Sequence, residues 1–176
     1  MEVKIFTKSD KETKKLGETL ALEILKSFDG AQDKLKTATV LSLEGDLGAG
    51  KTTFTQGFGK FLGVKEQIQS PTFVILKIYP VTPPNPPLVK GRSFSLIPSF
   101  IRRGKGRYSN LVHVDAYRLK SKDFKIFGWK NFIKNKDNII LVEWGNKIKN
   151  ILPKNSLRII FKHIGHSNER LIKIII

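Results

Sequence analysis

The stretch "LSLEGDLGAGKTTF" (residues 41–54) decides the fold of this chain. An apolar run stops at Gly45, and "GKTTF" then opens a segment typical of a helix. Gly45, Gly50, Lys51 and Thr52 fit the spacing G-x-x-x-x-G-K-[ST], in which a loop between a buried strand and a helix binds phosphate. A glycine-rich turn with a chance lysine is the alternative, and the strand before and helix after the loop favour the phosphate site.

Each position of the loop has a separate expected role. Gly48 and Gly50 let the backbone approach phosphate oxygens closely, and the N–H groups of the loop and helix start converge on one point. We expect Lys51 to reach the β- and γ-phosphates and the Thr52 hydroxyl to ligate Mg²⁺. The sequence therefore predicts a nucleoside triphosphate as ligand.

Runs of branched apolar residues predict strands on both sides of the loop. We place strands at residues 2–6, 39–43, 72–79, 110–117, 138–144, 157–164 and 171–176. We predict a helix at 9–28, where Ser9 and Glu12 have capping-box spacing, and another from about 51 to 62 that Gly63 ends. Such runs suit a sheet covered on both faces. The expected class is α/β, a P-loop NTPase-like three-layer fold with a mostly parallel central sheet and antiparallel additions.

Residues 81–109 depart from this pattern. They hold five of the eight prolines and six basic residues with no acid, and show neither helical nor strand periodicity. We interpret them as a Pro-rich basic insertion within a single domain spanning 1–176. The insertion is either a basic arm that grips RNA or a tolerated surface excursion, and its few aromatic residues favour the second.

The 32 Lys and Arg residues against 15 Asp and Glu give a net charge of +17, which favours anionic partners. An AT-rich genome, which favours Lys, Ile and Asn codons, would give the same excess, so the charge does not identify a partner. The absence of cysteine excludes disulfides and a thiolate nucleophile. Without an apolar leader or a membrane-length run, we expect a soluble cytoplasmic protein.

Two apolar strands end in acids, "LVHVD" at Asp115 and "IILVE" at Glu143. Carboxyl ends of parallel strands lie on the same edge as the phosphate loop, so both carboxylates are candidates for the metal and for hydrolysis. In "QSPTF" (69–73), Pro71 keeps Ser70 out of a helix and places Thr72 at a strand start, where its hydroxyl could sense the γ-phosphate. A simple loop-to-strand junction is an equal alternative for Thr72.

The histidines and tryptophans give weaker signals. His113 lies in mid-strand, which is typical of a packed and hydrogen-bonded side chain. His163 and His166 lack a Cys or carboxylate pattern, so we assign no transition-metal site. Trp129 and Trp144 fit the core and a partner surface equally well.

Four segments in order, "GDLGAGKTTF", "SPTF", "HVDAYRL" and "LVEW", resemble the bacterial TsaE (YjeE) family across nearly the whole chain except the insertion. The resemblance implies a small ATPase that acts with TsaB and TsaD in threonylcarbamoyladenosine modification of tRNAs that read ANN codons. It implies that the isolated protein is a weak ATPase and that these partners stimulate it. TsaD, and not this subunit, would be the transferase.

The resemblance also implies individual roles. The positions implied to bind ATP are Leu47, Gly48, Ala49, Gly50, Lys51, Thr52, Thr53, Asp10 and Arg170. Mg²⁺ is implied at Thr52 and Glu143. Asp115 takes the acid position needed for hydrolysis, with Lys51 and the switch-like Thr72. Tyr117 and Arg118 would support the strand end or a partner surface.

The chain departs from the family pattern after "YRL", where an acidic "PEEL…G" segment is usual and "KSKDFKIFGW" stands here. Arg170 also follows Glu169 instead of glycine, and the basic insertion is additional. Two alternatives remain open, a small-molecule kinase on the same fold and a basic nucleic-acid-binding module. A kinase generally needs an arginine-bearing lid, for which the unpatterned insertion is the only candidate stretch.

Overall fold

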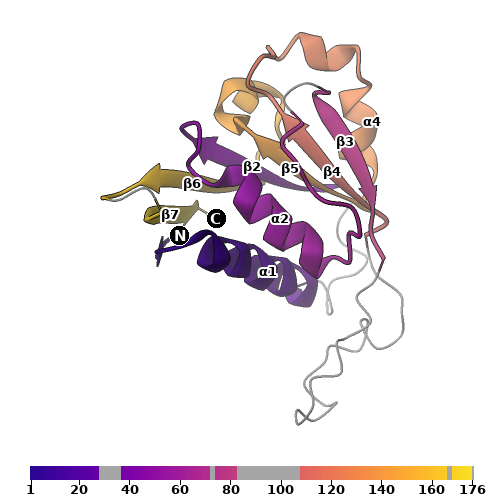
Figure 1. Cartoon of the computed structure of the whole chain (residues 1–176). Helices are drawn as coiled ribbons and strands as arrows, with labels where there is room; N and C mark the ends of the chain where they lie inside the picture. The colour runs from indigo at the N-terminus through magenta and orange to yellow at the C-terminus, as the bar shows by residue number, and fades with distance from the viewer. Residues whose placement is uncertain (28–36, 72–73, 83–107, 166–167, 176) are drawn as a thin grey trace.

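The computed structural model describes residues 1–27, 37–71, 74–82, 108–165 and 168–175. Within these residues a seven-stranded sheet has the order β1-β7-β6-β2-β5-β4-β3 (Figure 1). The strands are β1 (Glu2–Thr7), β2 (Thr39–Gly45), β3 (Leu76–Pro80), β4 (Asn110–Asp115), β5 (Asn138–Glu143), β6 (Leu157–His163) and β7 (Arg170–Ile175).

The four central strands, β6, β2, β5 and β4, run parallel, and the outer strands pair antiparallel. β3 is antiparallel to β4, and β7 is antiparallel to both β6 and β1. The predicted fold class, a parallel centre with antiparallel additions, is confirmed. This arrangement brings the carboxyl ends of β2, β4 and β5 to one edge.

Helices cover both faces of the sheet (Figure 1). One face carries α1 (Asp10–Ser27) and α2 (Lys51–Phe61), and the other carries η2 (Asp123–Lys125), α4 (Trp129–Lys134) and η3 (Gly145–Ile151). Alternate residues of β2 serve the two cores: Leu41 packs beneath α1 and α2, and Val40 packs with Trp129 of α4. No helix in the described part of the chain is long and apolar enough to cross a membrane.

The predicted start of α1 and the predicted end of α2 are confirmed. Ser9 Oγ accepts the Glu12 N–H at 3.2 Å, and the Glu12 carboxylate accepts the Lys8 N–H at 2.7 Å. Ser9 Oγ thus serves a backbone donor that the start of the helix leaves unpaired, and the Glu12 carboxylate reaches one residue beyond the N-cap. Gly63 follows the end of α2 with φ 78°, a left-handed conformation that suits glycine.

The strand expected at 72–79 begins later, at Leu76. Its predicted start is wrong because the backbone turns there: the Val74 and Ile75 N–H groups both donate to the Pro71 carbonyl, at 3.0 and 2.6 Å. Ile75 also has φ 69°, which no β-strand residue adopts. Thr72 and Phe73 lie outside the described residues, so the expected role of Thr72 remains a prediction.

The predicted insertion, 81–109, is described only at its two ends. Val81 N–H donates to the Ser109 carbonyl at 2.9 Å, which continues the pairing of β3 with β4. Tyr108 is 2% exposed, and its hydroxyl lies 2.6 Å from Thr39 Oγ1 at the start of β2. These ends therefore pack as part of the fold, and residues 83–107 lie outside the described residues.

Candidate functional site

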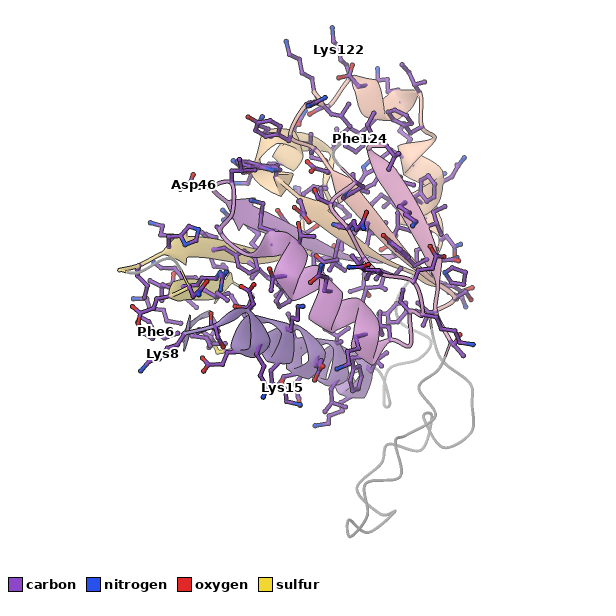
Figure 2. All side chains as sticks on the ribbon, viewed as in Figure 1. Phe6, Lys8, Lys15, Asp46, Lys122 and Phe124 are labelled. Atoms are coloured by element: carbon purple, nitrogen blue, oxygen red, sulfur yellow. The ribbon has the colours of Figure 1, made fainter. Side chains whose placement is uncertain are left out.

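The glycine loop, residues 45–52, connects β2 to α2 at the carboxyl edge of the parallel strands, where Figure 2 labels Asp46. Gly45 has φ 134°, and a Cβ there would lie 2.2 Å from the Phe161 carbonyl oxygen, so only glycine fits. Gly50 is the N-cap of α2 with φ 98°, no side-chain cap and no acid in the first turn. The first N–H groups of α2 are thus available to an anion.

Lys51 folds back over this loop. Its Nζ donates to the Gly45 and Asp46 carbonyls, each at 2.8 Å, and lies 4.0 Å from the centre of the Trp144 ring. Burial lowers the pKa of Lys51, and the charges of Glu143 and Asp115 partly offset that shift. The ammonium is therefore held at the loop by neutral partners that phosphate oxygens could replace.

Asp115 and Glu143 are the last residues of β4 and β5 and are direct partners in the parallel register. Both are buried, and Thr52 Oγ1 donates to Glu143 Oε1 at 2.7 Å. This hydrogen bond joins the first turn of α2 to the end of β5. The structure thus brings together Thr52 and Glu143, the two residues that were expected to hold the metal.

His113 contacts the same carboxylate, since its Nε2 lies 2.9 Å from Glu143 Oε1. Its side chain is fully buried in mid-strand, as the sequence predicted. The contact itself was missed, although the i, i+2 spacing of His113 and Asp115 places both on the same face of β4. Its Nδ1 has no hydrogen-bond partner among the described residues.

The Asp115 carboxylate is fixed from two sides. Oδ1 accepts the Tyr117 N–H at 2.8 Å, and Oδ2 accepts the Ser70 hydroxyl at 3.1 Å. Ser70 thereby links the "SPTF" segment to the strand end. From the sequence, Ser70 was expected only to be kept out of a helix by Pro71, so this contact was also missed.

A cavity of about 240 Å³ lies at the loop mouth. It is lined by Leu47, Gly48, Gly50, Lys51, Thr52, Thr53, Ser70, Asp115, Tyr117, Glu143 and Trp144. A larger open groove, about 1070 Å³, runs between α1 and α2, but no strand-end carboxylate lines it. The smaller cavity is therefore the candidate functional site.

Other predicted loop residues contribute differently. Leu47 is 81% exposed at the rim of the cavity, and Thr53 lines it. The Ala49 side chain is buried in the core, so Ala49 can contribute to a phosphate site only through its backbone.

Asp10 and Arg170 lie behind the loop and outside the cavity lining. Arg170 is buried, and its Nη2 lies 2.6 Å from Asp10 Oδ1. A Cβ on Gly50 would come within 2.7 Å of Arg170 Nε, so the guanidinium packs directly against the loop. Asp10 and Arg170, each expected near the nucleotide, therefore pair with each other beside the glycine loop, and their contact with a nucleotide remains a prediction.

Trp144 and Tyr117 form an aromatic wall beside the carboxylates, with ring centres 5.0 Å apart. Trp144 has φ 61°, which ends β5 and turns its ring toward Lys51. Lys147 closes the wall, because its Nζ donates to the Tyr117 carbonyl and lies 4.4 Å from the Tyr117 ring. From the sequence, Trp144 fitted the core and a surface equally well. The signal was an aromatic residue close after each strand-end acid, one residue after Glu143 and two after Asp115.

The oxygen atoms of Thr52 and Glu143 fit Mg²⁺, which takes hard oxygen ligands. In nucleotide sites one or two carboxylates suffice, because phosphates and water complete the octahedron. The described residues hold no group of three or more His, Cys, Asp or Glu arranged for a metal. A cation at this edge would therefore share its coordination with a bound phosphate.

Comparison with known proteins gives one consistent family. The family model "Threonylcarbamoyl adenosine biosynthesis protein TsaE" matches residues 7–90 and 86–172. The curated TsaE of Bacillus subtilis is 33% identical over 136 residues, 77% of this chain and 69% of that protein. The Rickettsia typhi TsaE is 32% identical over 168 residues, 94% of this chain and 90% of that protein.

A solved structure agrees with these sequence matches. The crystal structure of Bacillus subtilis YdiB matches at a TM-score of 0.62 and 28% identity, over 99% of this chain and 84% of that chain. The chain belongs to the TsaE family, whose members are named for tRNA threonylcarbamoyladenosine biosynthesis.

Proposed function

We propose that this chain binds ATP with Mg²⁺ at the glycine loop and hydrolyses it in support of threonylcarbamoyladenosine modification of tRNA. The tRNAs are those that read ANN codons, and the protein partners are TsaB and TsaD. Hydrolysis is slow in the isolated chain and is stimulated by these partners. The protein acts in the cytoplasm and is not itself the transferase.

The observation that carries the proposal is the hydrogen bond of 2.7 Å between Thr52 and Glu143. It places a hydroxyl and a carboxylate oxygen together at the mouth of a loop with an available helix N-terminus and a buried lysine. These are the parts that phosphoryl transfer requires, because its catalysis is mainly positioning and charge stabilisation.

Each side chain then has a defined task. Lys51 and the N–H groups from Leu47 to Thr53 hold the triphosphate, and Asp10 and Arg170 fix the back of the loop. Thr52 and Glu143 hold Mg²⁺, which when bound neutralises charge between the β- and γ-phosphates. Asp115, held by Ser70 and the Tyr117 N–H, orients the attacking water. Thr72 is proposed to sense the γ-phosphate.

The test is ATP hydrolysis by the chain alone and in a reconstituted mixture with TsaB and TsaD from the same genome. We expect a slow rate alone and a clear increase in the mixture. Asp115→Asn should abolish the increase while ATP binding persists, because the carboxylate acts on water and not on the phosphates. Lys51→Ala should abolish binding.

Equal turnover with and without the partners would contradict the proposed stimulation. An unchanged rate in Asp115→Asn would remove that residue from hydrolysis. ATP consumption that requires an added nucleoside or sugar acceptor would instead identify a kinase.

A further inference from the structure

Six lysines project from the η2–α4 side of the molecule and form what we call the lysine face. They are Lys120, Lys122, Lys125, Lys130, Lys134 and Lys136, all exposed, and Figure 2 shows Lys122 pointing away from the fold. Between them Ile126 is 84% exposed and Phe127 38% exposed. The segment therefore combines positive charge with exposed apolar side chains.

The side chains of the lysine face make no ion pairs in the part of the chain that the structure describes. Among the described residues, no carboxylate lies within ion-pair distance of any of the six lysine side chains. The single acid within the segment, Asp123, accepts the Lys120 backbone N–H at 2.8 Å instead. Uncompensated like charges repel one another and attract a polyanion.

Codon bias alone would add lysines without regard to position, and α1 shows a different arrangement. α1 carries four lysines and four acids, and Lys15 and Lys26 are paired with Glu18 and Glu23. Residues 119–136 carry six lysines and one acid. Residues 119–136 therefore carry a clear excess of positive charge, whereas the charges of α1 balance.

The lysine face is anchored to the core. Phe124 is 2% exposed and packs edge-on against Trp129 at 5.1 Å, and the Trp129 indole N–H donates to the Ile151 carbonyl. Figure 2 labels Phe124 on the inward side of the segment that carries Lys122. The lysines are therefore displayed on a packed support.

We propose that the lysine face binds the phosphate backbone of tRNA, with Phe127 available to stack on an unpaired base. Lysine is depleted in protein–protein interfaces but supplies phosphate contacts in nucleic-acid interfaces, which favours RNA over an acidic protein. Exposed aromatic side chains stack on bases of single-stranded RNA. The choice of tRNA as the RNA rests on the proposed function. The charge and exposure of the face are observed independently of it.

The face begins at Lys120, five residues after Asp115 and three after Tyr117, which lines the cavity at the glycine loop. RNA bound there would lie on the side of the fold opposite α1 and α2. None of the six lysines lines the cavity, so RNA binding and ATP binding can be separated by substitution.

The test is fluorescence anisotropy of a labelled, unmodified transcript of a tRNA that reads an ANN codon, titrated with the full chain at several salt concentrations. The variant carries Lys120→Gln, Lys122→Gln, Lys125→Gln and Lys130→Gln. The matched control removes the same charge from α1, through Lys11→Gln, Lys14→Gln, Lys15→Gln and Lys26→Gln. ATP affinity and thermal unfolding are measured for all three proteins.

We expect the lysine-face variant to bind tRNA at least about tenfold more weakly. The magnitude of its slope of log K against log salt should decrease by about 3, because each lost phosphate contact lowers that magnitude by about 0.7–0.9. The α1 control should retain most of the wild-type affinity and slope. Phe127→Ala should weaken binding about fivefold without changing the slope, because stacking releases no counterions. ATP affinity should stay at the wild-type value throughout.

Equal losses in the two four-lysine variants would show a response to total charge and overturn the proposal. Unchanged tRNA binding in the lysine-face variant would place the RNA contact elsewhere and also overturn it. Binding to anionic phospholipid vesicles without binding to tRNA would identify a membrane surface instead. If wild type binds tRNA as expected but not ATP, the proposed ATPase function fails while the assignment of the face stands.

Discussion

Two buried glutamates at neighbouring strand ends have opposite surroundings. Glu44, near the end of β2, is held by Arg158 through two contacts of 2.9 Å, and Ser42 Oγ adds a third hydrogen bond at 3.1 Å. Glu143, at the end of β5, accepts hydrogen bonds from Thr52 and His113. Among the described residues, no lysine or arginine lies within ion-pair distance of Glu143.

The difference indicates that Glu44 is a structural carboxylate and that Glu143 is suited to bind a cation. Burial alone would raise the pKa of Glu44, but the hydrogen bond and charge of Arg158 outweigh it and lower the pKa overall. Glu143 is 3% exposed and, in the described part of the chain, has no lysine or arginine paired to it, which suits a site that a metal ion neutralises. Burial alone therefore does not distinguish a functional glutamate from a structural one, whereas the side chains that contact its carboxylate do.

The largest expected effect comes from Glu143→Gln, which keeps the shape and removes the charge. We expect ATP hydrolysis in the three-protein mixture to fall by about 100-fold or more, because charge stabilisation at the phosphates is lost. Steady-state ATPase assays measure this. Glu44→Gln is the matched control, and an equal fall in both variants would erase the distinction between the two glutamates.

Thr52→Val should have the next largest effect. It removes the hydroxyl that lies 2.7 Å from Glu143 and retains the branched shape, so Mg²⁺-dependent ATP affinity should fall by about 10- to 100-fold. Thr52→Ser keeps the hydroxyl and should keep the affinity near wild type. Isothermal titration with and without Mg²⁺ compares them, and equal affinities for Val and Ser would remove the hydroxyl from the site.

Glu44→Ala should change stability more than activity. Loss of the contacts to Arg158 should lower the free energy of unfolding by about 1–3 kcal/mol, and the melting temperature by about 2–4 °C per kcal/mol. The folded pKa of Glu44 is lowered, so its contribution is present above the ordinary value of 4.5 and is lost as pH falls through the folded pKa. Thermal melts at pH 7 and pH 3 should show a difference from wild type at pH 7 that shrinks at pH 3. A difference that grows toward pH 3 would contradict this account.

The smallest effect concerns Trp144, whose ring lies 4.0 Å from Lys51 Nζ. ATP binding should draw the ammonium toward phosphate and change the emission of Trp144. Trp144→Phe should remove that change and alter ATP affinity by less than about fivefold, the size of one cation–π contact. Trp129→Phe is the control and should leave the change intact, so a signal that disappears with Trp129 would contradict the assignment.

Much of the fold could be predicted because strong local signals coincide. The glycine loop, the capping box at Ser9 and the apolar runs of β2, β4 and β5 each depend on residues close in sequence. The start of β3 could not, because Ile75 takes a left-handed turn despite its high strand propensity. The short η2 and α4 gave no periodicity, since three and six residues are too few to show it.

The carboxylates of the site could be predicted from the sequence, whereas the residues that hydrogen-bond to them could not. Asp115 and Glu143 end apolar strands, which is visible in the sequence. The contacts of Ser70 with Asp115 and of His113 with Glu143 span 45 and 30 residues, so only the folded sheet reveals them. Tyr108 likewise packs against Thr39 from the edge of a segment that has no pattern of its own.

The most direct test of the central claim is the affinity for ATP with Mg²⁺ and with EDTA, measured by isothermal titration for wild type, Glu143→Gln and Glu44→Gln. We predict that Mg²⁺ tightens ATP binding to wild type and to Glu44→Gln, and that most of this gain is absent in Glu143→Gln. An equal gain from Mg²⁺ in all three proteins would contradict the assignment of Glu143 to the metal.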